Sequence, residues 1–203
     1  MVPKPLDLSG ITIPADLQTK IPDGGKGAIT VLEKFIQEAN SIPEFQKGSH
    51  VNTAADYPLL ERLRLYLTPQ MFDDMKNKYL QPGGTAVFHN YVNDGSGFNT
   101  LVAGTVHPDD NGPVWHWGNE KATIEYASGN GLQGAVIKLP VRFAFNTSDK
   151  GIVSIYANRT YQILYNEDGS WLIGNIEWSA ADVRSSQDST MLLEAESPID
   201  NPS

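Results

Sequence analysis

The sequence predicts an α+β domain in which N-terminal helices pack on a strongly curved, cone-like antiparallel sheet. Three segments in the C-terminal half alternate apolar and polar residues, and a short polar turn joins each to the next: Ala135 to Phe145, Ile152 to Tyr165 and Trp171 to Trp178. Such alternation is typical of half-buried strands in an antiparallel meander. All helical patterns precede these segments, so the helices can cover the apolar face of the sheet.

Three helices are predicted ahead of the sheet. Apolar residues recur at helical spacing over residues 28–39 and stop before Pro43, which gives the first helix one apolar face. A short second helix is expected over residues 57–67. Thr68 then offers a hydroxyl as an N-cap, and Pro69 suits the first position of a third helix. The apolar face of this third helix consists of Met71, Phe72, Met75 and Tyr79.

Further strands are expected between the helices and the meander. Residues 85–92 and 98–106 are separated by a turn rich in Asn, Asp and Gly, which favours a tight reversal of the chain. Residues 114–117 and 122–127 form shorter strand candidates. The sequence therefore predicts that every strand follows the last helix.

The two ends of the chain differ in composition from its middle. Residues 1–27 contain repeated Pro and Gly, which indicate an extended leader that is poor helix material. We interpret this leader as a stalk downstream of a native anchor or signal; a naturally short leader is the alternative. Residues 28–183 are predicted to form a single cone-like α+β domain. Residues 184–203 are rich in Ser, Asp, Glu and Pro and are expected to be a flexible polar tail.

Composition excludes several classes of function. The chain has 203 residues, of which 40% are hydrophobic, so it can bury a core. A net charge of -9 disfavours nucleic acids and anionic membrane surfaces. The sequence has no Cys, and its 4 His show no repeated spacing, so we predict no disulfide, metal or cofactor. No apolar run is long enough for direct membrane insertion.

The order of these elements, ending in the segment from Tyr161 to Trp178, resembles the nuclear transport factor two-like superfamily, also called the cystatin-like α+β cone. The resemblance rests on a closing hairpin of strand, polar turn with Gly, Trp and apolar strand, and it covers residues 28–180. The leader is similar in style to extracytoplasmic domains of bacterial cell-envelope, conjugation or type IV secretion proteins, including the TcpC-like group. The resemblance implies a cell-surface or envelope location through an anchor, and self-association or protein binding through the open sheet face.

Three residues are weak candidates for proton transfer. His116 lies between Trp115 and Trp117, where a ring could act as a general base or hold a ligand; an ordinary alternating strand is the favoured alternative. Glu125 and Glu177 lie inside strand patterns, and enzymes with the cone fold commonly use a carboxylate that projects into the cone. Alternation cannot decide which face of the last strand is interior, and a solvated or partner-facing Glu177 is favoured. No residue is assigned as catalytic.

Aromatic residues are concentrated in the predicted strands 114–117, 152–165 and 171–178, and they have two possible roles. They are core and cross-strand pairs, or they line an interface or the cavity of the cone. The candidates for an interface or cavity lining are Trp115, Trp117, Tyr156, Tyr161, Trp171 and Trp178.

Two hypotheses of function follow. The preferred one is a non-catalytic extracytoplasmic interaction or assembly domain of a bacterial cell-envelope, conjugation or secretion protein. Its partners are proteins or further copies of itself, and it requires a cavity filled by side chains. The alternative is a small-molecule binding protein, or an enzyme of the isomerase or dehydratase type, with its site in the cone. That alternative requires an open cavity in which at least two candidate groups converge.

Overall fold

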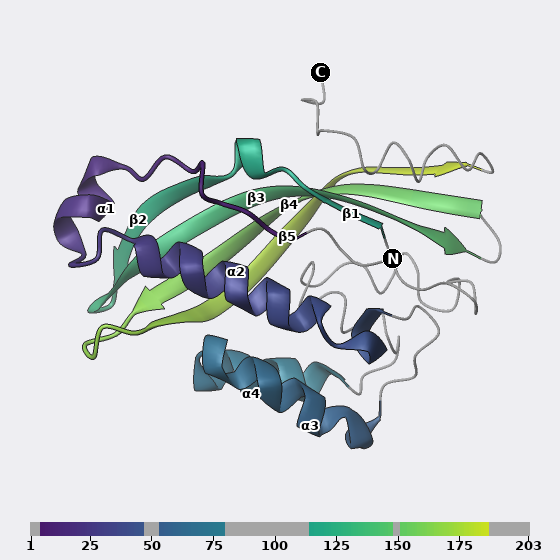
Figure 1. Cartoon of the computed structure of the whole chain (residues 1–203), viewed down its shortest axis with the longest axis horizontal. Helices are drawn as coiled ribbons and strands as arrows, with labels where there is room; N and C mark the ends of the chain where they lie inside the picture. Colours follow the sequence, from purple (N-terminus) through teal and green to yellow (C-terminus); the bar gives the residue numbers. More distant parts are fainter. Residues whose placement is uncertain (1–4, 47–52, 80–113, 148–150, 187–203) are drawn as a thin grey trace.

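A computed structural model describes residues 5–46, 53–79, 114–147 and 151–186. The helices precede the strands along the chain, and helix α2 lies across one face of an antiparallel sheet (Figure 1). The helices are α1 (Ala15–Lys20), α2 (Lys26–Asn40), α3 (Tyr57–Leu60) and α4 (Pro69–Tyr79). The strands are β1 (Val114–Trp117), β2 (Thr123–Gly129), β3 (Leu132–Thr147), β4 (Gly151–Tyr165) and β5 (Trp171–Ser186). The predicted α+β class is confirmed.

The sheet is four strands wide. Strands β3, β4 and β5 pair in sequence order, and β1 and β2 share the other edge of β3. Strand β2 pairs with residues 132–138 of β3, whereas β1 pairs with residues 141–144. The three long predicted strands are therefore confirmed, although β5 continues to Ser186, into the segment expected to be a flexible tail. The expected strands at 85–92 and 98–106, and residues 187–203, lie outside the described residues.

The expected strong curvature of the sheet is wrong. Strands β3 and β4 keep one register from Gln133↔Tyr165 to Thr147↔Gly151. Within the described strands, the register shifts between β4 and β5 alone, where β5 inserts one extra residue at Gly174 and another at Ala181. Bulges are the main device by which a strand bends. Because the β3–β4 ladder has none, the sheet is not strongly curled and does not form the predicted cone.

The core lies between α2 and the sheet. Helix α2 has the predicted apolar face, and Leu32, Phe35 and Ile36 on it are fully buried. On the sheet, alternate residues over 135–141 of β3 and 153–163 of β4 are buried on the side that α2 covers, including Ile137 and Ile163. Burial of each large apolar side chain contributes about 1.5–3 kcal/mol to stability. The apolar face of α2 thus covers the apolar face of the sheet, and both are removed from water.

Helix α4 begins at the predicted residue. The Thr68 hydroxyl accepts a hydrogen bond from the Met71 backbone N–H at 3.2 Å, as expected of an N-cap, and Pro69 is the first helical residue. The Thr68 N–H donates to the Ile173 carbonyl at 2.9 Å, which fixes this end of α4 to β5. The predicted buried face of α4 is confirmed, with Met71, Phe72, Met75 and Tyr79 in the core.

The second predicted helix is divided. It starts as α3 and continues as a 3₁₀ helix over Glu61–Tyr66. In a 3₁₀ helix the side chains at i and i+3 lie one above the other. The guanidinium of Arg64 accordingly reaches the Glu61 carboxylate, with Nη2 to Oε1 at 2.9 Å. This local ion pair suits the tighter helix.

The expectation of an extended leader is wrong where the structure describes this segment. Residues 15–20 form α1, and the core includes Leu6, Leu8, Leu17 and Ile21. The Leu8 N–H also donates to the Glu33 carboxylate of α2 at 2.7 Å. The apolar residues between the Pro and Gly residues pack against α2 and the sheet, so this segment belongs to the core and is not an extended leader.

The Asp23 carboxylate joins the start of α2 to the start of β5. Its Oδ2 accepts hydrogen bonds from the Gly27 N–H at 2.9 Å and from the Trp171 indole N–H at 2.8 Å. Its Oδ1 accepts from the Gly25 N–H at 2.9 Å. A Cβ on Gly27 would lie 2.2 Å from Trp171 Cδ1, so the indole lies directly against the helix backbone. One acidic side chain therefore holds two segments that are 148 residues apart.

We expect Asp23→Ala to lower the free energy of unfolding by about 1–3 kcal/mol, because the Trp171 indole N–H and the backbone N–H groups of Gly25 and Gly27 lose their acceptor. Chemical denaturation monitored by circular dichroism measures the change. Trp171→Phe should remove much of the same energy, and the double variant should lose less than the sum of the two. Asp73→Asn, at an exposed carboxylate on α4, is the control and should have little effect. Strict additivity of Asp23→Ala and Trp171→Phe would contradict the assigned contact.

Two glycines of the β2–β3 hairpin provide a second, matched prediction. A Cβ on Gly134 would lie 2.1 Å from the Ile163 carbonyl oxygen, whereas a Cβ on Gly129 would meet nothing within 4 Å. Gly134→Ala must push β3 and β4 apart and should cost about 1–3 kcal/mol of stability. Gly129→Ala should change stability little. Equal denaturation midpoints for the two variants would show that β3 and β4 are not this close.

Candidate functional site

The sheet face opposite α2 is exposed and polar; we call it the open face. Residues on it pair across the strands in two neighbouring rows. One row is Thr123, Lys138, Thr160 and Glu177; the other is Glu125, Val136, Gln162 and Asn175. Most of these side chains are exposed to solvent, and the others are half-buried. The open face therefore differs in character from the apolar face that α2 covers.

The two candidate carboxylates lie at opposite margins of the open face. Glu125 on β2 forms an ion pair with Lys138, with Nζ and Oε1 2.9 Å apart. Glu177 on β5 accepts a hydrogen bond from the Asn175 side-chain amide at 2.8 Å. Both carboxylates are exposed, and three strand spacings of about 4.8 Å separate their strands, roughly 14 Å in all. They cannot act on one substrate atom together in this arrangement.

His116 is also distant from Glu125. It occupies the β1 position that pairs with Arg142, whereas Glu125 pairs with Val136. Six residues of strand separate these two positions on β3, which corresponds to about 20 Å. The structure thus does not bring the three candidates for proton transfer together.

Three of the candidate interface aromatics belong to the core. Trp117, Tyr161 and Trp171 are buried on the helix side of the sheet. Tyr156 is half-buried on β4 and pairs in register with Arg142. Trp115 and Trp178 occupy positions opposite Phe143 and Arg159 respectively. The buried three stabilise the fold and are not available to a partner.

Arg159 is a buried charge that sequence reasoning did not single out. It is fully buried on β4, at a position where the strand alternation otherwise places apolar residues. Its guanidinium carbon lies 4.9 Å from the centre of the Trp117 ring. Its Nη1 lies 3.4 Å from the Tyr161 hydroxyl, to which it donates a hydrogen bond. The ring face and the hydroxyl help to compensate for the cost of burying this charge.

A second buried polar group joins α3 to α4. The Tyr79 hydroxyl donates to Asp56 Oδ2 at 2.9 Å, and the Thr53 N–H donates to the same oxygen at 2.8 Å. Burial, and then the hydrogen bond to Asp56, raise the pKa of Tyr79 well above its usual value. This arrangement holds the phenol in its protonated form and serves the packing of the two helices.

The raised pKa of Tyr79 predicts a loss of stability in alkali. The unfolded chain releases the phenol proton near pH ~10, whereas the folded chain retains it. Stability from this group is therefore complete below about pH 10 and falls by about 1.4 kcal/mol per pH unit above it. Denaturation of the native protein and of Tyr79→Phe across this pH range measures the effect. The variant should show a shallower decline; identical slopes would contradict a protonated Tyr79 in the folded chain.

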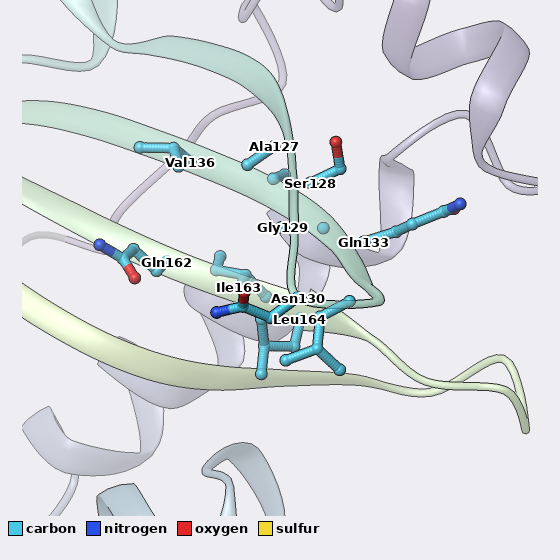
Figure 2. A pocket seen from close by; sticks show the side chains of 12 residues that line it. Ala127, Ser128, Gly129, Asn130, Gln133, Val136, Gln162, Ile163 and Leu164 are labelled. Atoms are coloured by element: carbon cyan, nitrogen blue, oxygen red, sulfur yellow. The ribbon is translucent and has the colours of Figure 1, made fainter.

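A hollow of about 340 Å³ lies at the tip of the β2–β3 hairpin (Figure 2). Residues 127–130, 132–136 and 162–164 line it, and we call it the hairpin hollow. The turn at its end consists of Asn130 and Gly131, whose φ angles of 50° and 78° suit a two-residue hairpin. The sequence carried this turn signal. It did not indicate that β4 would complete a hollow beside it.

The lining of the hairpin hollow is uncharged. Ser128, Asn130, Gln133 and Gln162 contribute hydroxyl and amide groups, and the remaining lining residues are aliphatic or Gly. None of these described residues has a side chain that titrates near neutral pH. The hollow can therefore bind an uncharged group through apolar contacts and hydrogen bonds, but its lining offers no side chain for general acid or base catalysis.

Among the residues that the structure describes, no group of three or more His, Asp or Glu side chains is placed to hold a metal ion. No helix within these ranges has the length and apolar character needed to cross a bilayer. Comparisons with models of protein families, with curated protein sequences and with solved structures found no significant match to this chain.

Proposed function

We propose that this protein is a non-catalytic interaction domain that binds a protein partner, or another copy of itself, through the open face. The observation that carries the proposal is the contrast between the two faces of the sheet. Helix α2 buries one face, whereas Thr123, Lys138, Asn158 and Glu177, which come from four different strands, are exposed on the other. A broad, regular polar face on a rigid sheet is a suitable platform for recognition.

The alternative of a small-molecule site or an isomerase-type active site in a cone has less support. That alternative needs an open cavity between the helices and the sheet. Large side chains occupy this region, including the fully buried Phe35, Phe72 and Tyr161. Glu125 and Glu177 are also exposed and lie on opposite margins of the sheet. They therefore do not form a pair of groups around a common substrate.

The chemistry of the open face favours a polar protein partner. Glu125, Lys138 and Glu177 place both signs of charge on it. Non-obligate protein interfaces are about as polar as the remaining protein surface, so a large apolar patch is not required. The net charge of -9 disfavours an anionic membrane as the partner.

The proposed biological setting rests on the sequence resemblance described above. We propose an extracytoplasmic domain of a bacterial cell-envelope, conjugation or secretion protein, held at the surface by an anchor. The order of N-terminal helices followed by an antiparallel sheet is compatible with the nuclear transport factor two-like superfamily.

Site-specific photo-crosslinking in the source cells tests the proposed function. A photoreactive residue is placed at Asn158, at the centre of the open face, and in a control at Gln37, which is exposed on α2. We expect a discrete crosslinked protein from position 158 and none from position 37. The same experiment on purified protein detects self-association. Absence of crosslinks at position 158, or equal products from both positions, would overturn the proposal.

A further inference from the structure

We infer that the hairpin hollow seats one uncharged aliphatic side chain of a protein partner and is the anchor point of the open face. This inference rests on the proposed function, because it treats the hollow as part of a protein interface. Interfaces commonly depend on a few side chains that fill pockets on the partner. Val136 and Gln162 belong both to the lining of the hollow and to the open face.

The hollow lies where small residues of β2 and β3 are opposite one another. Gly134 pairs in register with Ala127 on β2 and with Leu164 on β4. Gly134 cannot be replaced by a larger residue without moving β4, because its Cβ would meet the Ile163 carbonyl oxygen. The close approach of the two strands thus keeps this position without a side chain, and Gly134 and Ala127 leave space beside Leu164 that an apolar group of a partner can occupy.

The lining selects an uncharged occupant. Val136 and Leu164 are half-buried and offer aliphatic contacts, while the amides of Asn130 and Gln162 can bond to a peptide group at the rim. A charged group would enter with no opposite charge in the lining, and burial without such a partner is costly. An aliphatic side chain of a partner would contact Val136 and Leu164, and its peptide groups could form hydrogen bonds with the amides of Asn130 and Gln162.

The openness of the hollow favours a protein over a free small molecule. Ser128, Asn130, Leu132 and Gln162 are all exposed, and Leu132 retains 52% of its accessible surface. Small-molecule sites usually bury about 70–90% of the ligand surface. A hollow with such exposed walls covers less, so affinity has to come from further contacts. The open face supplies them, since Gln162 continues in register to Asn175 on β5.

Titration of the full chain with N-acetyl-leucinamide, followed by NMR, tests the hollow directly. This neutral probe carries one aliphatic side chain between two peptide groups. We expect weak, saturable binding, with a Kd of about 1 mM or above. The shifts should centre on the amides of Gly129 and Gly134 and on the side-chain amide of Gln162. N-acetyl-leucine, which carries a carboxylate, should bind more weakly.

Two variants test the location of binding. Ala127→Leu fills the hollow and should weaken probe binding by about tenfold or more; Leu132→Ser removes an exposed wall without touching the core and should also weaken it. Gln37→Ala, at an exposed residue of α2 outside the lining, is the control and should leave Kd unchanged. Absence of saturable shifts, or unaltered binding to Ala127→Leu with its fold intact, would overturn the inference.

The outcomes separate the inference from the proposed function. Open-face crosslinks without probe binding would reject the hollow as the anchor point and leave the interaction function standing. Probe binding without open-face crosslinks would reject the interaction function, and with it the role of the hollow in a protein interface.

Discussion

Burial of one face of the sheet beneath α2 is the constraint on which the remaining structure depends. The alternating residues of β3 and β4 present an apolar surface that only a second layer can remove from water, and the apolar face of α2 supplies that layer. The Asp23 carboxylate positions the two layers, because it accepts hydrogen bonds from the first turn of α2 and from Trp171 at the start of β5. Apolar burial, which has no preferred direction, holds the helix against the sheet. The hydrogen bonds to Asp23, which are directional, set where along the sheet the helix begins.

The same constraint gives the open face its character. When one side of an antiparallel sheet is buried, the residues between the buried ones are directed to the other side and are free to be polar. Lys138 and Gln162 are examples, each next in sequence to a buried core residue. A surface of this kind can acquire binding function without disturbing the core. The hairpin hollow lies where this polar face meets a stretch of small residues.

The buried polar groups serve the fold in this arrangement. Arg159 lies over Trp117, and Asp56 joins Tyr79 to the backbone ahead of α3. In a sheet protein with one main core, such groups restrict how the elements can pack, because each polar atom needs its particular neighbours. Their positions inside the core, away from the open face, separate the residues that hold the structure from those that can meet a partner.

The local elements can be predicted from the sequence alone, because their signals come from neighbouring residues. The apolar spacing from Ala28 to Ala39, the Thr68 cap and the alternation in β4 depend on helical or strand geometry alone. Long-range packing sets four further features: which face of β5 is interior at Glu177, the burial of Arg159, the packing of Leu8 and Leu17, and the absence of strong curvature. Each of these depends on contacts between distant segments, such as the β4–β5 register and the approach of Gly134 to Ile163. The hairpin hollow belongs to the same class. Its turn is local, at Asn130 and Gly131, but its third wall comes from residues 162–164 of β4, which the sheet register places beside β3.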